Sequence, residues 1–181
     1  MNSPLLKLII PKRYDDSRGF FSEIYNRENY KNMNINDEFV QDNHSLSIET
    51  GTLRGLHFQS PPFAQGKLVR CGRGAIFDVA VDIRRGSPTY GCWEGYKLTD
   101  KNGHQLYIPV GFAHGFLTLE DHSEIVYKCT NYYAPQTEAS IHWDSCGIDW
   151  SISEYPILSE KDLKATLFKD LYSPFVYGEN S

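Results

Sequence analysis

Side chains that could move protons recur in a small set of motifs along this chain. The motifs are Arg54-Gly55-Leu56-His57, Gly66-Lys67-Leu68-Val69-Arg70, Tyr127-Lys128, Tyr132-Tyr133 and Asp162. Histidine is the side chain best suited to take a proton near neutral pH, and a carboxylate on its far nitrogen fixes its tautomer. A neighbouring lysine can stabilise negative charge that develops on an oxygen. The set therefore predicts proton abstraction next to a carbonyl group, with an enolate as intermediate.

This chemistry constrains where the residues must lie. Inverting a carbon requires a proton to leave one face of a ring and to be replaced on the other, so a base and an acid must flank the ring. The interior of a barrel can provide them from opposite walls. His57 and Lys67 are predicted on neighbouring strands joined by the proline-rich turn Ser60-Pro61-Pro62-Phe63, so we expect them to face one cavity. Any one of these residues alone would more often be a packing residue or a satisfied core polar group.

A second segment resembles part of a metal-binding motif. Pro109-Val110-Gly111-Phe112-Ala113-His114 has the P-x-G-x-x-H form of the second half of the cupin metal motif. The first half of that motif needs two histidines one residue apart, whereas this chain has His57-Phe58-Gln59. A catalytic metal site needs about three protein ligands. The sequence therefore favours the cupin fold without the cupin metal, with His114 as a buried, hydrogen-bonded residue near the cavity.

Several other enzyme classes lack their motifs here. There is no G-x-G-x-x-G after a first strand, no G-x-x-x-x-G-K-[ST] and no G-x-S-x-G, which argues against dinucleotide-binding, P-loop and hydrolase-type sites. The four cysteines, Cys71, Cys92, Cys129 and Cys146, form no C-x-x-C pair. We therefore expect isolated thiols in a reducing cytosol rather than a zinc ribbon or a redox pair.

Length and charge set further limits. The chain has 181 residues, a net charge of −5 and 40% hydrophobic residues, which suits one globular domain. Nucleic acids and anionic membranes normally need a basic surface, so neither is an expected partner. The N-terminal apolar run is interrupted by Lys7 and stopped by Pro11. It is too short for a secretory leader or a membrane span, and we expect a cytoplasmic protein.

The elements that must position these residues are mostly strands. Short segments rich in Val, Ile, Tyr, Phe and Thr are separated by Gly, Pro, Asn or Asp. The predicted strands are Phe20–Tyr25, Phe39–Ile48, Thr52–Phe58, Lys67–Cys71, Ala75–Ile83, Trp93–Leu98, Gln105–Pro109, Gly115–Leu119 and Glu124–Thr130. Ala75–Ile83 does not alternate cleanly, so we expect burial on both sides, with Asp78 and Asp82 in need of partners inside the barrel. The pattern predicts an all-β protein, a cupin-type jelly roll.

Helical patterns are scarce and peripheral. Asn26–Met33 could hold a short helix, and Ser159–Leu167 begins with a capping-box-like pair, Ser159 and Asp162. No repeat, linker or low-complexity tract divides the chain, so residues 1–181 are predicted to form one domain. Residues 170–181 are predicted to form a C-terminal tail whose aromatic residues pack on a neighbour.

Taken in order, the motifs resemble those of the dTDP-4-dehydrorhamnose 3,5-epimerases, metal-free enzymes with the cupin-type jelly roll. The matching segments are R-G-F-F at Arg18–Phe21, F-V-Q-D-N-H-S at Phe39–Ser45, L-R-G-L-H-F-Q at Leu53–Gln59, Q-G-K-L-V-R at Gln65–Arg70, F-D-V-A-V-D-I-R at Phe77–Arg84, I-P-V-G-F-A-H-G-F at Ile108–Phe116, Y-Y-A-P at Tyr132–Pro135 and L-S-E-K-D at Leu158–Asp162. Each is weak alone, but the ordered set is specific and covers most of the chain.

The resemblance implies a role for each matching position. His57 would be the base, oriented by Asp162; Tyr127 would be the acid on the opposite face; and Lys67 would stabilise the enolate at the 4-keto oxygen. The implied substrate contacts are Arg18 and Arg54 with the diphosphate, Tyr133 stacked on the thymine, and Glu23, Gln41, Asn43, His114, Glu138 and Lys161. The resemblance also implies no metal or other cofactor. It further implies a homodimer in which an N-terminal segment reaches into the partner's site.

The sequence departs from the family pattern in two places and allows more than one activity. The stretch Asp144–Trp150 is shorter than the usual loop, and the aromatic residues after Lys169 match no family role. The simplest interpretation is inversion of C3 and C5 of dTDP-4-dehydro-6-deoxy-D-glucose to give dTDP-4-dehydro-L-rhamnose. Inversion of one carbon, or a related nucleotide, would need most of the same residues. Two further hypotheses are a metal-dependent cupin enzyme and a non-catalytic sugar-nucleotide binder.

Overall fold

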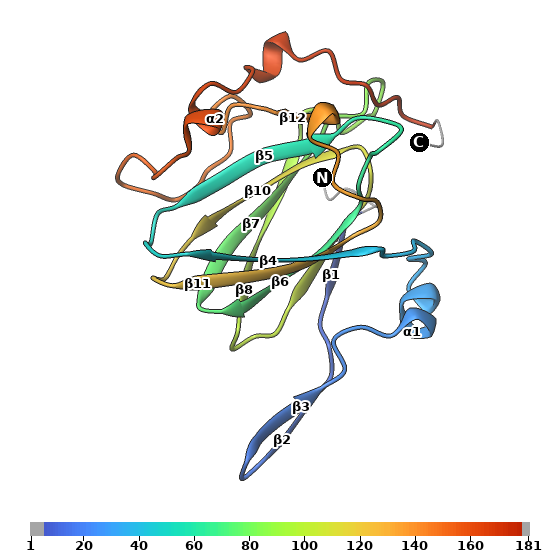
Figure 1. Ribbon diagram of the computed structural model, residues 1–181, viewed down its shortest axis with the longest axis vertical. Helices are drawn as coiled ribbons and strands as arrows, with labels where there is room; N and C mark the ends of the chain where they lie inside the picture. Colours follow the sequence, from blue (N-terminus) through green and yellow to red (C-terminus); the bar gives the residue numbers. More distant parts are fainter. Residues whose placement is uncertain (1–5, 179–181) are drawn as a thin grey trace.

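The fold is a barrel of two five-stranded antiparallel sheets, seen in a computed structural model that describes residues 6–178 (Figure 1). The first sheet has the order β1 (Lys7–Ile9), β9 (Gln105–Ile108), β6 (Lys67–Arg73), β11 (Ser123–Cys129) and β4 (Gln41–Ser47). The second has the order β12 (Glu138–Ser140), β5 (Leu53–Gln59), β10 (Phe112–Thr118), β7 (Ala75–Asp82) and β8 (Trp93–Thr99). From β4 to β7 the chain alternates between the sheets, as in a jelly roll. The predicted fold class is confirmed.

Alternation along the strands separates an inner core from an outer one. In β7, Ile76 and Ala80 belong to the cluster between the two sheets, whereas Val79 and Val81 belong to a cluster on the outer face of the second sheet. All four are fully buried. The prediction that this strand is buried on both sides is therefore confirmed. One part of the space between the sheets is filled by apolar side chains, and the polar residues of the site occupy another part.

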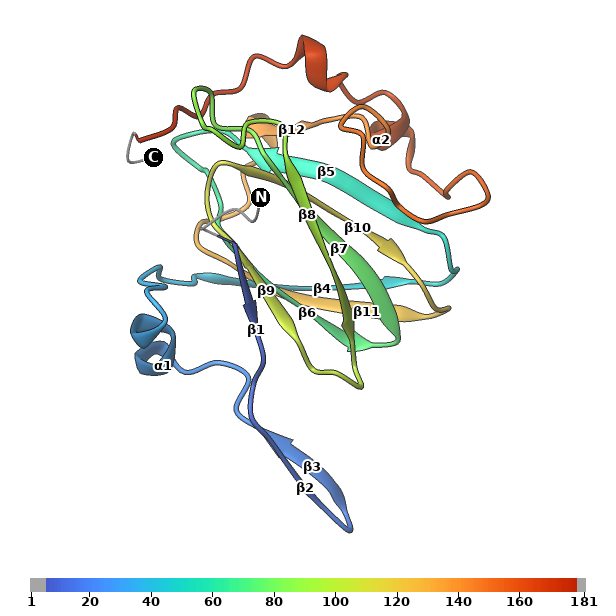
Figure 2. The same cartoon turned by 180° about the vertical axis from the view of Figure 1, so that it is seen from behind.

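Peripheral segments cover the outer faces of both sheets. Helix α1 (Arg27–Asn32) contributes Tyr30 to a cluster on the first sheet with Leu68 and Tyr107. The chain after Ser140 crosses the second sheet (Figures 1 and 2). It contains the short helix α2 (Glu160–Leu163) and a 3-10 turn, η2 (Phe168–Asp170). Another 3-10 turn, η1 (Pro135–Thr137), precedes β12. No helix within residues 6–178 is long and apolar enough to cross a membrane.

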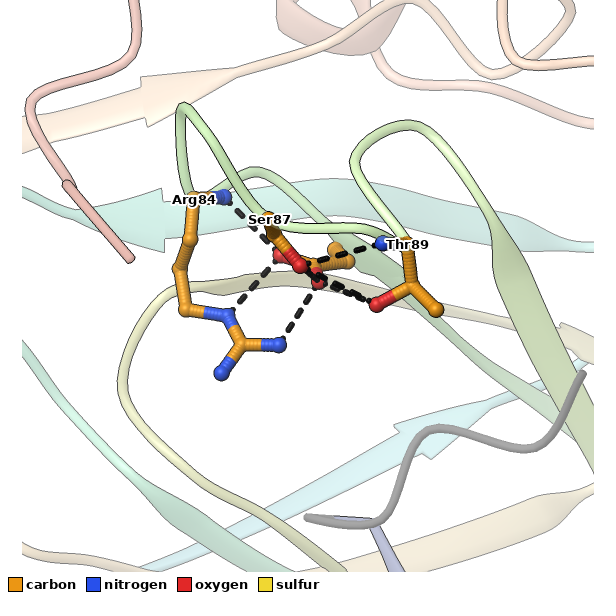
Figure 3. Close-up of polar contacts among 4 residues, drawn as sticks. Arg84, Ser87 and Thr89 are labelled. Atoms are coloured by element: carbon orange, nitrogen blue, oxygen red, sulfur yellow. Dashed lines mark hydrogen bonds and ion pairs between the residues drawn. The ribbon is translucent and has the colours of Figure 1, made fainter. Parts of the chain in front are cut away.

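Asp82, at the end of β7, has the partners that burial demands. Its carboxylate accepts hydrogen bonds from Arg84 Nε at 2.9 Å, Arg84 Nη2 at 2.6 Å, Ser87 Oγ at 2.6 Å and Thr89 Oγ1 at 2.7 Å (Figure 3). Burial alone would raise the pKa of Asp82, but the bonds from Arg84, Ser87 and Thr89 outweigh it and hold the pKa below its ordinary value. This ion pair closes the turn between β7 and β8.

Several boundaries differ from those predicted. Three short strands were not predicted: β1, β12 and β2 (Arg13–Asp16), which forms a hairpin with β3 (Gly19–Ser22). The expected strand Phe20–Tyr25 stops at Ser22, and β10 begins at Phe112 rather than Gly115. Helix α1 matches its prediction, with Asn26 as N-cap. The predicted helix over Ser159–Leu167 is a single turn, because Thr166 leaves it to bridge with Ile141.

The C-terminal segment packs on its own chain, so the prediction that its aromatic residues pack on a neighbour is wrong for Phe175. This side chain is only 3% exposed and belongs to the outer core of the second sheet. Its ring lies edge-on to Phe58 at a centroid distance of 6.0 Å. Tyr172 is exposed and lies over the Arg85 guanidinium. Residues 179–181 of the predicted tail lie outside the described residues.

Phe175→Ala is expected to lower the free energy of unfolding by about 3–5 kcal/mol, the usual cost of emptying a buried phenylalanine site. Urea denaturation at fixed protein concentration measures it. The matched control is Tyr172→Ala, because Tyr172 is 78% exposed and an exposed substitution should change stability by about 0.5 kcal/mol or less. Equal effects of the two changes would contradict the assignment of Phe175 to the core.

Candidate active site

One cleft between the two sheets holds most of the predicted site residues. It consists of two adjoining hollows of about 370 and 380 Å³, both lined by His57, Lys67 and Tyr127. The first hollow also contacts Gln41, Asn43, Phe58, Gln59, Gln65, Tyr133 and Glu138. The second also contacts Ser45, Thr52, Leu53, Arg54, His114, Phe116, Ile157, Leu158, Ser159 and Asp162. The three shared residues therefore lie where the two hollows meet.

The three shared residues come from opposite walls. His57 is on β5 in the second sheet, whereas Lys67 and Tyr127 are on β6 and β11 in the first. The prediction that β5 and β6 are neighbouring strands is therefore wrong, because the turn after β5 carries the chain across to the other sheet. The prediction that His57 and Lys67 face one cavity is correct. A ring bound in the cleft would lie between the imidazole and the phenol.

His57 is oriented by a buried carboxylate. Its Nε2 lies 2.6 Å from Asp162 Oδ1, and the Asp162 side chain is only 4% exposed. Burial raises the pKa of Asp162, but hydrogen bonds from His57 and Ser159 outweigh it and hold the pKa below its ordinary value of 3.8. An ionised carboxylate only accepts, so Nε2 of His57 carries the proton. Nδ1 is then the nitrogen that can accept a proton from a ligand.

Asp162→Asn should destabilise the protein most near neutral pH and progressively less as the pH falls below about 4. Asp162 has a lowered pKa in the folded state, so its carboxylate contributes stability above its unfolded pKa and loses this contribution as acid protonates it. Urea denaturation of both proteins between pH 3 and pH 7 measures the difference. A difference that stays constant over that range would contradict the assignment of an ionised Asp162.

Ser159 completes this group. It is the N-cap of α2, and its Oγ accepts from Asp162 N at 3.2 Å and donates to Asp162 Oδ2 at 2.8 Å. The capping pattern seen in the sequence therefore also holds the carboxylate that orients His57. Ser159 was not predicted as a site residue, although the S-x-x-D spacing gave the signal.

Glycines allow β5 and β10 to approach closely beside the site. A Cβ on Gly55 would collide with the backbone of Gly115, and Gly55 has a φ of +132° that side-chain-bearing residues rarely adopt. The register between the strands shifts between His114 and Phe116, and His57 lies directly opposite His114. The motifs R-G-L-H at Arg54–His57 and G-F-A-H-G-F at Gly111–Phe116 therefore place the imidazoles of His57 and His114 side by side on the cleft face of this sheet.

Burial shifts the proton affinities of Tyr127 and Lys67. It raises the pKa of Tyr127, and the nearby Cys129 and Glu138 act in the same direction while Arg54 opposes them. The phenol is therefore protonated at neutral pH and can act as an acid. Burial lowers the pKa of Lys67, and Cys129, Asp78 and Glu138 oppose the shift. Within residues 6–178 Lys67 makes no ion pair, so its amino group faces the cleft without a carboxylate bound to it.

A second group of predicted residues lies at the edge of the first hollow. Glu138 Oε2 accepts from Lys161 Nζ at 2.6 Å and from Tyr133 Oη at 2.9 Å. Burial raises the pKa of Glu138, but these two partners outweigh it and lower the pKa. Gln41 Oε1 accepts from the Tyr133 backbone amide at 2.9 Å. The structure thus brings the exposed Tyr133 ring and three polar side chains together.

Three further predicted cleft residues have hydrogen-bond partners: Asn43, Arg54, and His114, whose Nε2 lies 2.7 Å from Asp78 Oδ1. Asn43 accepts from Gln41 Nε2 at 3.0 Å and donates to Cys129 Sγ at 3.4 Å. Arg54 donates from Nε to Ser47 Oγ at 3.1 Å and from Nη2 to Leu46 O at 3.2 Å. His114 is buried, as predicted, and lines the second hollow.

Arg18 and Glu23 do not reach the cleft of their own chain. Arg18 is in the turn of the β2–β3 hairpin, which projects away from the barrel in both views (Figures 1 and 2). Its side chain is 88% exposed and pairs with Asp16 at 2.6 Å. Glu23 accepts from Asn26 and Asn29 at the start of α1. Arg18 and Glu23 therefore do not lie beside His57 within one chain, and their contact with the substrate stays a prediction.

Two further features of the cleft concern metal binding and Gln59. Within residues 6–178 no group of three or more His, Cys, Asp or Glu is arranged to hold a metal ion. Gln59, which was not predicted, accepts from Ala134 N at 2.9 Å and donates to Phe63 O at 2.6 Å and Tyr132 O at 3.1 Å. It therefore ties down the loop that carries Tyr133. Its place in the motif L-R-G-L-H-F-Q was the available signal.

Comparison with known proteins gives a consistent result. The family model described as dTDP-4-dehydrorhamnose 3,5-epimerase matches residues 4–170. A dTDP-4-dehydrorhamnose 3,5-epimerase from Salmonella typhimurium is 52% identical over 167 residues, covering 91% of this chain and 91% of that one. A crystal structure of the dTDP-6-deoxy-D-glucose-3,5-epimerase of Legionella pneumophila, in complex with dTDP-4-keto-L-rhamnose, superposes with a TM-score of 0.89. It is 48% identical and covers 94% of this chain and 93% of that one.

A more distant neighbour is a 3'-monoepimerase from Streptomyces bikiniensis, solved in complex with dTDP-quinovose. It has a TM-score of 0.83 at 33% identity and covers 89% of this chain and 82% of that one. The family model covers more than half of the chain, and the Salmonella relative is 52% identical over most of it. On these matches, the chain belongs to the dTDP-4-dehydrorhamnose 3,5-epimerase family.

Proposed function

We propose that the protein is an epimerase that inverts C3 and C5 of dTDP-4-dehydro-6-deoxy-D-glucose to give dTDP-4-dehydro-L-rhamnose. The observation that carries the proposal is the placement of His57, oriented by Asp162, and protonated Tyr127 on opposite walls of one cleft. The names of the relatives at 50% and 52% identity support the same substrate and product.

In the proposed reaction His57 Nδ1 removes the proton from a carbon next to the ketone. The electron pair of the broken C–H bond forms a double bond to C4, and the pair of the ketone C=O moves to its oxygen. Lys67 offsets the negative charge on this enolate oxygen. Tyr127 then donates a proton to the same carbon from the opposite face, so the configuration is inverted. Repeating the sequence at the second carbon on the other side of the ketone gives the product. Each inversion returns His57 and Tyr127 to their starting states after proton exchange with solvent.

The binding groups divide along the cleft. Arg54 suits the diphosphate, because guanidinium groups bind phosphate oxygens with two parallel hydrogen bonds. Tyr133 presents an exposed ring on which the thymine would stack. Gln41, Asn43, Glu138 and Lys161 provide polar contacts near that ring, and His114 contacts the substrate in the second hollow.

Proton NMR in heavy water with dTDP-4-keto-6-deoxyglucose tests the proposal. The expected result is replacement of the hydrogens at both C3 and C5 by deuterium, together with formation of the L-rhamno product. Exchange at one position only would favour inversion of a single carbon, for which the 3'-monoepimerase neighbour is the precedent. Absence of exchange, with the nucleotide sugar still bound, would contradict an enzymatic function and favour a binding module.

We also propose a homodimer in which Arg18 and Glu23 complete the partner's cleft. The β2–β3 hairpin extends beyond the barrel and exposes Tyr14, Phe20 and Phe21, with 54%, 57% and 68% of each residue accessible. Exposed apolar side chains on a projecting arm are typical of a surface that another molecule covers. The Arg18 guanidinium, at the turn of the arm, would then reach the diphosphate.

Mixed dimers should show complementation between Arg18→Ala and His57→Asn. Each homodimer is expected to have low activity, because both of its clefts lack one residue. A dimer of one chain of each kind has one intact cleft, so co-expressed chains with different tags should recover about half of the wild-type activity per mixed dimer, as expected for one-site-in-two assembly of a symmetric dimer. Mixed dimers no more active than the two homodimers would contradict a contribution of Arg18 from the partner.

A further inference from the structure

The β2–β3 hairpin has little to hold it against the barrel of its own chain. It forms a separate two-stranded sheet and pairs with neither barrel sheet. Within residues 6–178, the Arg13 side chain provides the only hydrogen bond between hairpin residues 13–22 and the barrel strands or the turns that join them. A two-stranded hairpin is only marginally stable by itself. Apart from the chain connections at its base, the direction of the hairpin therefore depends on how Arg13 is held.

Arg13 uses two edges and one face of its guanidinium group. Nη1 donates to Lys101 O at 3.0 Å, and Nε donates to Asp15 Oδ1 at 3.2 Å. The face of the group lies over the Phe20 ring, with Cζ 3.5 Å from the ring centroid. Asp15 and Phe20 are cross-strand partners in the hairpin. Arg13 therefore connects both strands of the hairpin to the turn that contains Lys101.

The turn that accepts this hydrogen bond is itself well fixed. It joins β8 to β9, and Asn102 Oδ1 accepts from the backbone amides of Thr99 at 3.0 Å and His104 at 2.9 Å. The backbone amide of Asn102 donates in return to Thr99 Oγ1 at 2.8 Å. The Lys101 carbonyl therefore gives Arg13 a fixed point of attachment on the barrel.

A small change of direction at the base of the hairpin has a large effect at its tip. Arg18 follows Arg13 by five residues, or up to about 16 Å of extended backbone. A rotation of about 10° at Arg13 would move the turn at Arg18 by about 2–3 Å over this length. A hydrogen bond to a phosphate oxygen does not survive a displacement of that size.

We propose that Arg13 is a positioning residue that fixes the direction of the β2–β3 hairpin and thereby places Arg18 at the diphosphate in the partner's cleft. The inference deepens the proposed epimerase function and rests on it and on the proposed homodimer. Lysine could not replace Arg13 fully, because an ammonium group lacks the planar fork that bonds along two edges while its face stacks on a ring.

The first test is a double-mutant cycle between Arg13→Met and Arg18→Ala. Arg13→Met should raise KM for dTDP-4-keto-6-deoxyglucose about 10-fold, the usual cost of losing a hydrogen bond to a charged group. It should change kcat little, because the diphosphate is remote from the reacting carbons. Adding Arg13→Met to Arg18→Ala should lower kcat/KM no further, since Arg13 acts through Arg18. Additive losses would overturn the proposal.

Arg85→Met is the matched control for Arg13→Met. Arg85 is also stacked on an exposed aromatic ring, that of Tyr172 at 4.4 Å, but it lies outside the hairpin and does not line the cleft. This variant should keep the wild-type KM. An equal rise of KM in both variants would overturn the proposal, because the effect would then be unrelated to the hairpin.

Mixed dimers separate positioning of the hairpin from a general structural effect. If one chain carries His57→Asn, the active cleft belongs to the other chain and receives the hairpin of the His57→Asn chain. Arg13→Met should therefore raise KM when it is on the His57→Asn chain and leave KM unchanged when it is on the other chain. The same KM from both placements would overturn the proposal.

Titration calorimetry with dTDP provides a readout that does not need turnover. The affinity for dTDP should fall about 10-fold in Arg13→Met and should fall no further when Arg13→Met is added to Arg18→Ala. An unchanged affinity in Arg13→Met, or a monomeric wild-type protein in light scattering, would overturn the proposal. If the wild-type dimer binds dTDP but does not convert the sugar nucleotide, the proposed function fails, while the dTDP titrations still decide the role of Arg13.

Discussion

His57→Asn should reduce kcat about 10²–10⁴-fold, the contribution usual for a general base, and should abolish deuterium exchange at C3 and C5 together. Both effects have one cause, because proton removal starts both inversions and Nδ1 of His57 is the available base. The dissociation constant for dTDP should change little, since the polar contacts around Tyr133 do not include His57. Steady-state kinetics and isothermal titration calorimetry with dTDP measure the two quantities.

A matched control for this change is His44→Asn. His44 is also on a strand, β4, and also pairs with a carboxylate, Glu124, but it is exposed and does not line the cleft. This variant should keep its turnover. If His57→Asn weakened dTDP binding as much as it slowed turnover, His57 would be a binding contact and the proposed assignment would be wrong.

Tyr127→Phe should separate proton exchange from inversion. Without the phenol the substrate carbon can still lose its proton to His57, and the enolate can regain deuterium from the same face. We therefore expect deuterium to enter the substrate with retained configuration, while formation of the L-rhamno product falls about 10²–10⁴-fold. Time-resolved proton NMR in heavy water follows both processes in one sample.

The outcome of Tyr127→Phe discriminates between two arrangements of the site. Loss of exchange and inversion in equal measure would mean that Tyr127 assists proton removal, so that it does not act only from the opposite face. Full inversion without the phenol would mean that another group is the acid. Phenylalanine preserves the ring that packs against the inner core cluster, so the change should not disturb the barrel.

The central strands, and the residues that share the cleft, were predictable from the sequence because each depends on local pattern. Ala75–Asp82 has apolar residues on both faces, which indicates a strand buried on both sides. His57, Lys67 and Tyr127 occur in motifs whose glycines and residue types point to one kind of chemistry. Alternation along a strand tells which residues share a face. The prediction of a common cavity therefore succeeded without knowledge of the sheet order.

The features that were not predicted from the sequence depend on contacts between residues that are distant in the chain. Alternation within β5 and β6 does not reveal that they belong to different sheets, because the pattern is the same on either wall. β12 has only three residues, and its pairing with β5 defines it. The burial of Phe175 depends on contact with Phe58, which no local signal announces. Asp78 Oδ2 is buried without a hydrogen-bond partner within residues 6–178, and this becomes evident only when the neighbouring strands are in place.

The order of elements in the chain has a consequence for synthesis. His57 and the carboxylate that orients it are separated by 105 positions, and β11, which carries Tyr127, lies between them. The segment that delivers Asp162 is joined to β5 through backbone bonds between Ile157 and both Gly51 and Leu53. During synthesis all the described strands, which end with β12 at Ser140, are therefore made before Asp162, the residue that orients His57. A chain that ended before this segment would contain His57 without the carboxylate that orients it.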